Sequence, residues 1–156
     1  MPNKETIITS AIIILISYTL CLSLVSQVFP ASQTSKTLSN TGSIQIQTSE
    51  GIGIYSDLPC NNPLTAMSWG TLEPGTSKDI VSYIKNEGSD PTTLSLETSN
   101  WIPTEASTYL DLSWDYDDQP ISPDDVIEIT FTLTVSASIE GITDFSFDVT
   151  IGGTTY

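Results

Sequence analysis

The residues whose types and spacing suggest chemistry are the aspartates of one short segment. Residues 114–125 read WDYDDQPISPDD. Because Ca²⁺ takes roughly six to eight oxygen ligands, many of them carboxylates, this segment is a candidate calcium site. The Gly and the terminal Glu of an EF-hand loop are absent, and carboxylates on a loop are readily solvated. A solvated acidic hairpin is therefore the favoured interpretation, and calcium binding is the alternative, with the ligands Asp115, Asp117, Asp118, Asp124 and Asp125.

Other groups that could support catalysis are scarce. The chain of 156 residues has 19 Asp and Glu, four Lys, no Arg and no His, and its formal net charge is −15. Without His there is no imidazole acid or base, no Ser–His or Cys–His nucleophile and no histidine metal ligand. A glycosidase needs two carboxylates about 5 to 9.5 Å apart, and here the sequence offers only proximity within a loop. We expect no enzyme activity, no cofactor other than Ca²⁺, and no nucleic-acid binding, which requires clustered Lys and Arg.

Aromatic residues suggest a second kind of site, a platform on which a sugar ring could stack. Trp69 and Trp114 fall in phase with neighbouring apolar positions, which predicts that both pack in a core. Trp101 lies instead in the connecting segment SNWIP. It either caps one end of the domain or is exposed for binding, and the sequence leaves both interpretations open. The other aromatic candidates are Tyr109 and Tyr116.

The N-terminal part of the chain predicts a membrane anchor. Residues 7–29 carry no formal charge, and at about 1.5 Å rise per residue they would form a helix of about 35 Å, long enough to cross a bilayer. One lysine lies on each side of this segment, Lys4 before it and Lys36 after it, so the count of basic residues does not decide the orientation. The acidic region after the segment favours a cytoplasmic N-terminus. No position after the segment offers the small residues that signal peptidase requires at −3 and −1. A single-pass cell-membrane protein with a signal anchor is therefore favoured over a secreted one. The segment contains Cys21, the only possible disulfide mate of Cys60, so no intrachain disulfide is expected.

The rest of the chain is organised as a linker and one domain. We expect the membrane helix within residues 1–30, a small polar linker at residues 31–42, and an extracytoplasmic β-rich domain at residues 43–156. In that domain apolar residues alternate with polar ones, most clearly at residues 127–135 and 145–151, as is typical of half-buried strands.

The spacing of strands and turns predicts the fold class. Turn residues at 86–91 are expected to close a hairpin between the strands on either side. Roughly seven or eight short strands, with no amphipathic helix among them, predict an all-β, antiparallel, immunoglobulin-like β-sandwich.

A resemblance to known proteins rests on one stretch of this domain. Residues 69–88 read WGTLEPGTSKDIVSYIKNEG, and a SPDDV turn and a Thr-rich strand follow at residues 122–135. This pattern resembles archaeal cell-surface sandwich domains, which share a turn, a strand, an Asn-x-Gly hairpin and a long strand that begins after a proline. Over residues 43–152 the chain is similar to small membrane-tethered proteins of that kind and, more loosely, to camelysin and TasA-like surface proteins. Camelysin-type proteins are described as metal-dependent proteases, and the absence of His argues against that activity here.

The expected function is a structural, adhesive or binding role at the cell surface. The expected partners are the membrane, through residues 7–29, and a surface protein or a glycan. A filament component is the alternative, because pilins and archaellins also join an N-terminal hydrophobic helix to a β-rich head. A prepilin-type site would place basic residues and then Gly or Ala before the helix, and Lys4-Glu5-Thr6 does not match it. A carboxylate-based hydrolase ranks last, and the sequence does not fix the oligomeric state.

Overall fold

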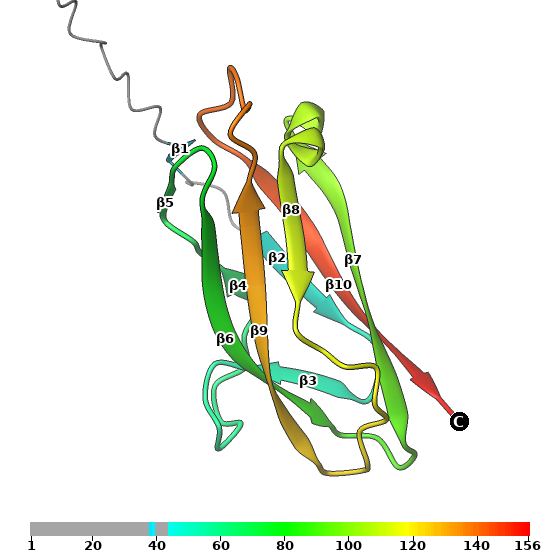
Figure 1. Cartoon of the computed structure of the whole chain (residues 1–156). Coiled ribbons are helices and arrows are strands. Elements are labelled where there is room, and N and C mark those ends of the chain that lie inside the picture. The colour runs from blue at the N-terminus through cyan, green and yellow to red at the C-terminus, as the bar shows by residue number, and fades with distance from the viewer. Residues whose placement is uncertain (1–37, 40–43) are drawn as a thin grey trace, which may run out of the picture. The chain divides into compact units, whose positions relative to one another are not determined.

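The computed structural model describes residues 38–39 and 44–156, and every long element among them is a β-strand (Figure 1). These residues belong to a compact unit spanning residues 35–156. The elements are β1 (Leu38–Ser39), β2 (Ile44–Thr48), β3 (Ile52–Tyr55), β4 (Ala66–Met67), β5 (Thr71–Leu72), β6 (Ser77–Asn86), β7 (Thr92–Ile102), the 3-10 helix η1 (Thr104–Thr108), β8 (Leu110–Trp114), β9 (Val126–Val135) and β10 (Ser146–Thr155).

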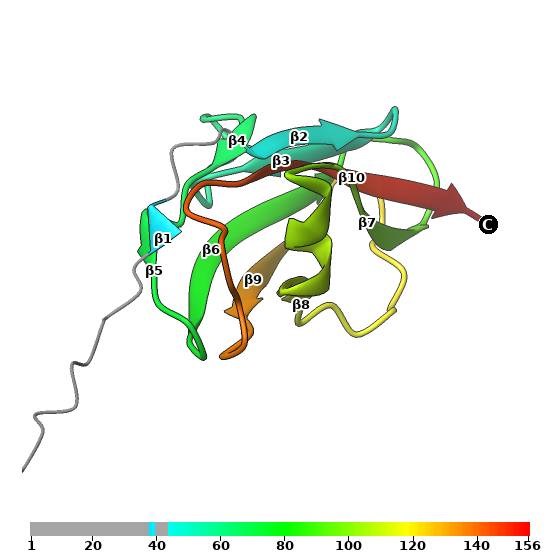
Figure 2. The same ribbon diagram turned by 90° about the horizontal axis from the view of Figure 1, so that it is seen from above.

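Two four-stranded sheets form the domain, with strand orders β4–β2–β10–β7 and β3–β6–β9–β8. They face each other as the two layers of a β-sandwich (Figure 2). β1 and β5 form a separate two-stranded pair, in which Leu38 lies opposite Leu72. β1 falls within residues 31–42, the predicted linker. The predicted all-β class is confirmed.

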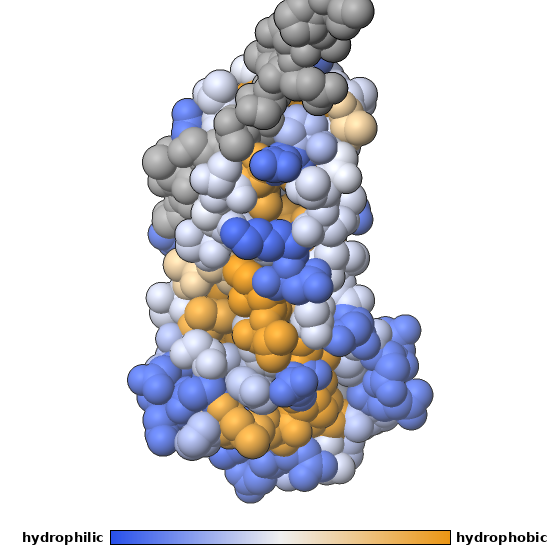
Figure 3. Space-filling view, turned by 60° about the vertical axis from the view of Figure 1, so that its left-hand side comes forward, coloured by the Kyte–Doolittle hydropathy of each residue, from blue (hydrophilic) through white to orange (hydrophobic). Residues whose placement is uncertain are grey.

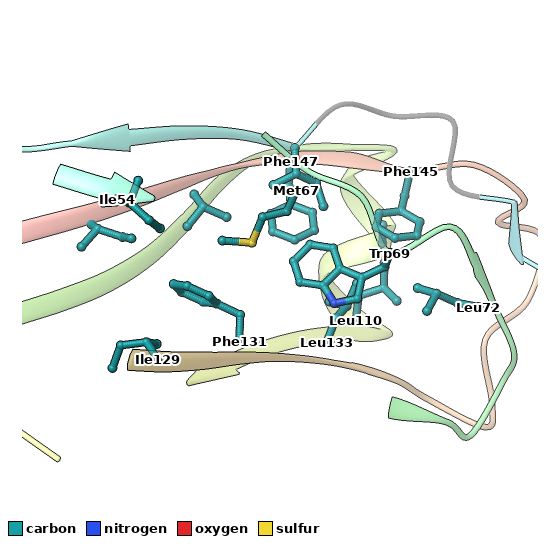
Figure 4. Close-up of a cluster of buried hydrophobic side chains, with 14 of the residues drawn as sticks. Ile54, Met67, Trp69, Leu72, Leu110, Ile129, Phe131, Leu133, Phe145 and Phe147 are labelled. Carbon is teal, nitrogen blue, oxygen red and sulfur yellow. The ribbon is translucent and has the colours of Figure 1, made fainter. Parts of the chain in front are cut away.

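Period-two alternation explains how the longest strands build the core. Ile129, Phe131 and Leu133 on β9 are buried, and the residues between them are more exposed. The same holds for β10, where the predicted strand is confirmed. Trp69, between β4 and β5, is only 1% exposed, and its Nε1 donates to the Lys78 carbonyl at 3.1 Å. Burying each large apolar side chain contributes about 1.5–3 kcal/mol, and Figure 4 shows Trp69 beside Leu110 and Leu133 in this core.

The turn at residues 86–91 does not close a hairpin, which corrects the prediction. β6 pairs with β3 and β9, whereas β7 pairs with β10 in the other sheet. The turn therefore crosses from one layer to the other. The backbone of Asn86, the last residue of β6, is bonded instead to the residues just before β9. Its N–H donates to the Asp125 carbonyl at 3.1 Å and its carbonyl accepts the Asp124 N–H at 2.8 Å.

The sheets are also not wholly antiparallel, which corrects a second prediction. β2 runs parallel to β10, with Gln45 opposite Asp148 and Thr48 opposite Ile151. After β2 the chain turns into β3 of the other sheet, so β2 does not pair with its successor in the sequence. Alternation predicts which face of a strand is buried, and it carries no information about the direction of the neighbouring strand.

The expected membrane helix, residues 7–29, lies outside the described residues, as does the expected linker apart from β1. Within residues 38–39 and 44–156, no helix has the length and apolar character needed to cross a membrane.

Candidate functional site

The acidic loop, residues 115–125, connects β8 to β9 at one end of the sandwich, as the sequence predicts. Its carboxylates have separate partners. Asp115 Oδ1 accepts the Thr130 N–H at 2.8 Å, and Asp117 Oδ1 accepts the Gln119 N–H at 3.2 Å. Across the part of the chain that the structure describes, no three His, Cys, Asp or Glu residues are grouped so that they could hold a metal ion. The calcium site at Asp115, Asp117, Asp118, Asp124 and Asp125 stays a prediction.

The Asp124 carboxylate forms an ion pair with Lys85, at 3.3 Å between Oδ1 and Nζ. The Asp124 side chain is 88% exposed. An exposed pair of this kind contributes only about 0–1 kcal/mol, because water screens it. The loop must therefore owe its position to other contacts.

Those contacts join the acidic loop to the edge of β7. Thr92 and Ile121 exchange backbone hydrogen bonds of 3.0 and 2.9 Å. The Tyr116 hydroxyl accepts the Leu94 N–H at 3.2 Å and donates to the Gln119 carbonyl at 2.6 Å. Ile121, which is a residue of this loop, is buried. The acidic loop thus covers part of an edge strand whose backbone groups would otherwise be free to pair with another chain.

Asn86 joins this loop to the turn at residues 86–91. Its side chain is fully buried, and its Nδ2 donates to the Asp90 carbonyl at 2.8 Å and to the Ile121 carbonyl at 2.9 Å. Its Oδ1 accepts the Gly88 N–H at 2.9 Å. A buried amide with three bonds holds two loops in one arrangement. From the sequence alone, only an Asn-x-Gly turn is predicted at this position.

A neighbouring carboxylate in that turn is also bonded to a neutral donor. The Tyr55 hydroxyl on β3 donates to Glu87 Oε1. This hydrogen bond, with smaller contributions from burial and from the Glu87 charge, raises the pKa of Tyr55 to about 12. On the same sheet, a hydrogen bond to Glu128 is the main reason that the pKa of Tyr83 is raised. Two carboxylates beside this sheet, Glu87 and Glu128, are thus bonded to tyrosine hydroxyls.

The Trp101 pocket lies where β7 ends and η1 begins. It is an open cavity of about 640 Å³, lined by Asn100, Trp101, Ile102, Thr104 and Ser107. The Trp101 indole stacks on the Phe147 ring of β10, with ring centroids 4.0 Å apart and planes inclined by 18°. Phe147 is only 1% exposed. The half-buried indole is therefore supported by the core on one side and contributes to the wall of the cavity.

Polar groups in this lining are fixed by bonds of their own. Asn100 Nδ2 donates to Asp148 Oδ2 at 2.7 Å, which leaves the amide oxygen as an acceptor. Ser107 Oγ donates to the Thr104 carbonyl at 2.8 Å, which leaves the lone pairs of the hydroxyl. The five lining residues carry an amide and two hydroxyls and no formal charge.

A second cavity, of about 260 Å³, is lined by polar and apolar residues of β2, β3 and residues 63–65. Its lining includes Ile46, Ile54 and Leu64, together with Tyr55 and Glu87. The face that Figure 3 brings forward shows hydrophobic side chains gathered in a band between hydrophilic ones.

The tryptophans show which sequence-based interpretations hold. The predicted core position of Trp69 is confirmed, and Trp114 packs against the core at 5.9 Å from the Phe131 ring centroid. Trp101 packs against the core, as the first of its two open alternatives predicts, and its half-buried indole also lines a cavity. A binding role for Trp101 stays a prediction. The segment SNWIP, predicted to be a connection, is instead the end of strand β7 as far as Ile102, which corrects that prediction. Thr104 and Ser107 were missed because the 3-10 turn that holds them has no apolar period.

No model of a known protein family matches the sequence, and no curated protein is significantly similar to it.

Proposed function

We propose that the protein is a single-pass, membrane-tethered cell-surface protein whose immunoglobulin-like sandwich has a non-catalytic binding, adhesive or structural role outside the cytoplasm. One observation carries the proposal: a charge-free apolar segment of bilayer length precedes a unit, residues 35–156, that packs its own hydrophobic core. A unit with its own core needs no burial against the apolar segment, which leaves that segment available for lipid.

The charge of the domain supports a place in solvent beyond a membrane. Lys78 and Lys85 are the only basic residues after residue 37, against eighteen Asp and Glu in the same stretch. Such an excess of one charge keeps domains soluble and apart through their mutual repulsion. The immunoglobulin-like assignment is supported by two facing sheets whose connections cross between the layers.

The test is membrane extraction of the full-length protein carrying a C-terminal tag. We expect it to stay with membranes in alkaline carbonate, to keep residues 1–30 by intact mass, and to lose its tag when protease is added to intact cells. The double variant Ile13→Arg, Leu15→Arg should be released, because each charge at a helix centre costs about 2.5–3.5 kcal/mol. The matched variant Ile13→Val, Leu15→Ile should remain in the membrane. A mature N-terminus between residues 27 and 33, or a protected tag, would contradict the proposal.

In the filament alternative, residues 7–29 pack against the same segment of other copies instead of against lipid. Helices packed at a filament axis approach closely along faces of small residues. Here Ser10, Ser17 and Ser23 are irregularly spaced, and residues 12–16 are bulky on every side. We therefore expect dispersed single copies in electron micrographs of the full-length protein after detergent removal. Ordered fibres with these helices at their axis would favour the filament.

A further inference from the structure

We propose that the Trp101 pocket binds the ring of a neutral saccharide. This inference deepens the binding role proposed above and names the chemical class of the ligand. It rests on three properties of the pocket, which are an aromatic wall held rigidly by the core, hydrogen-bonding groups beside that wall, and a lining without charge.

The aromatic wall is preorganised. The Trp101 indole is stacked at 4.0 Å on Phe147, whose ring is in turn 6.2 Å from that of Phe145, and both phenylalanines are buried. A ligand that meets this indole need not pay to order it, and preorganisation of this kind raises affinity. The faces of sugar rings carry C–H groups, which suit the electron-rich face of an indole.

The polar groups beside the wall match hydroxyls. The Asn100 amide is oriented by its bond to Asp148, so its oxygen is an acceptor, and the Thr104 hydroxyl can both donate and accept. Sugar hydroxyls also donate and accept. A small number of fixed polar groups around an apolar surface is the usual composition of small-molecule sites, whose volumes of about 300–1,000 Å³ include that of this pocket.

Charge argues against other ligands. An anion would meet no Lys in the lining and an overall charge of −15. A quaternary ammonium group is held by several aromatic faces together, whereas Trp101 is the only aromatic residue in the lining. A ligand that combines apolar ring faces with uncharged hydroxyls fits all of these conditions.

The test is saturation-transfer NMR on the full-length protein in a zwitterionic, sugar-free detergent, with cellobiose, maltose and N,N′-diacetylchitobiose as probes. We expect transfer to the ring protons of at least one of the three and none to glucuronate. Trp101→Ala should weaken that binding at least about tenfold, as expected for the loss of about 1.4 kcal/mol or more. Trp114→Phe, which changes a tryptophan outside the pocket, should bind as the unchanged protein does.

A second variant keeps the test decisive if Trp101→Ala fails to fold. Thr104→Val preserves the shape of the side chain and removes the hydroxyl, and it should weaken binding several-fold with an unchanged circular dichroism spectrum. The proposal is overturned if none of the three disaccharides shows transfer, or if both pocket variants bind as tightly as the unchanged protein. Failure here would leave carbonate extraction and protease accessibility untouched, so it is distinguishable from failure of the membrane tether.

Discussion

The acidic loop holds the densest group of charges in the described domain, whereas the Trp101 pocket is lined by uncharged side chains alone. In the loop, the carboxylates of Asp115 and Asp117 accept backbone N–H groups, and the backbone between them and β9 is paired with β7. In the pocket, an open cavity is lined by the Trp101 indole, which is stacked on Phe147, and by polar atoms that can still accept hydrogen bonds. A dense group of carboxylates is therefore not by itself a binding site, since those of the acidic loop are solvated or bonded to nearby backbone, whereas the pocket offers a concave surface.

The largest expected effect comes from breaking the amide that fastens the acidic loop. Asn86→Ala should lower the free energy of unfolding by about 2–4 kcal/mol, because it removes three hydrogen bonds made by a fully buried amide and leaves a cavity in its place. Urea denaturation measures this change. Asn100→Gly is the control: it removes an exposed amide with a single bond at a φ of 53°, which glycine adopts readily, and it should cost less than about 1 kcal/mol. Equal losses in the two variants would mean that the Asn86 bonds do not hold the loop.

The next effect concerns the rigidity of the pocket wall. Trp101→Ala should lower the free energy of unfolding by about 2 kcal/mol, since it removes half-buried apolar surface and the ring stack on Phe147. Trp101→Phe keeps a ring in place and should recover about half of that loss. Thermal melting and an independent urea series measure the stability of both variants against that of the unchanged protein. A Trp101→Ala protein as stable as the parent would show that the indole is not held by the core.

Calcium gives a smaller effect at the acidic loop. The sequence-based prediction is that Ca²⁺ raises the melting temperature, and binding to the folded state alone at 100 times the dissociation constant adds about 2.7 kcal/mol. We expect less, because Asp115 and Asp117 would give up backbone N–H partners to reach a shared ion. The melting temperature is measured in Ca²⁺ and in Na⁺ at matched ionic strength. Identical melting temperatures in the two salts would mean that the acidic loop is only a solvated hairpin.

The smallest effect is a dependence on alkaline pH. Because the Tyr55 pKa is raised from 10.0 to about 12 in the folded state, this group contributes stability that is complete below pH 10 and is lost as the pH rises toward 12. The bond to Glu87 is exposed, so screening by water keeps the contribution small. Tyr55→Phe should flatten the fall in stability over this range in a urea series. Tyr156→Phe, at a side chain that is 80% exposed, should leave it unchanged.

The sequence predicts the class of this fold better than its connections. Alternation along β9 and β10 identifies a two-layer β protein, because half-buried strands expose every second residue. It does not show that the turn after Asn86 crosses between layers, because that depends on bonds to Ile121 and Asp125, which are distant in the sequence. The spacing of the aspartates likewise does not fix the directions of their side chains. The Trp101 pocket combines the end of a strand with a 3-10 turn, and neither the two-residue period of strands nor the 3.6-residue period of α-helices identifies such a place in a sequence.

The parallel pairing of β2 with β10 gives the domain a mechanical property. β1 and the C-terminus lie at opposite ends of the sandwich (Figure 1), and the two paired strands run in the same direction between them. Tension applied to the two ends would slide β2 and β10 past each other lengthwise. The register pairs from Gln45–Asp148 to Thr48–Ile151 would then share the load at once, whereas peeling breaks one pair after another. Because forced unfolding is governed by the unfolding rate, we expect this shear arrangement to make the domain resist tension along its length.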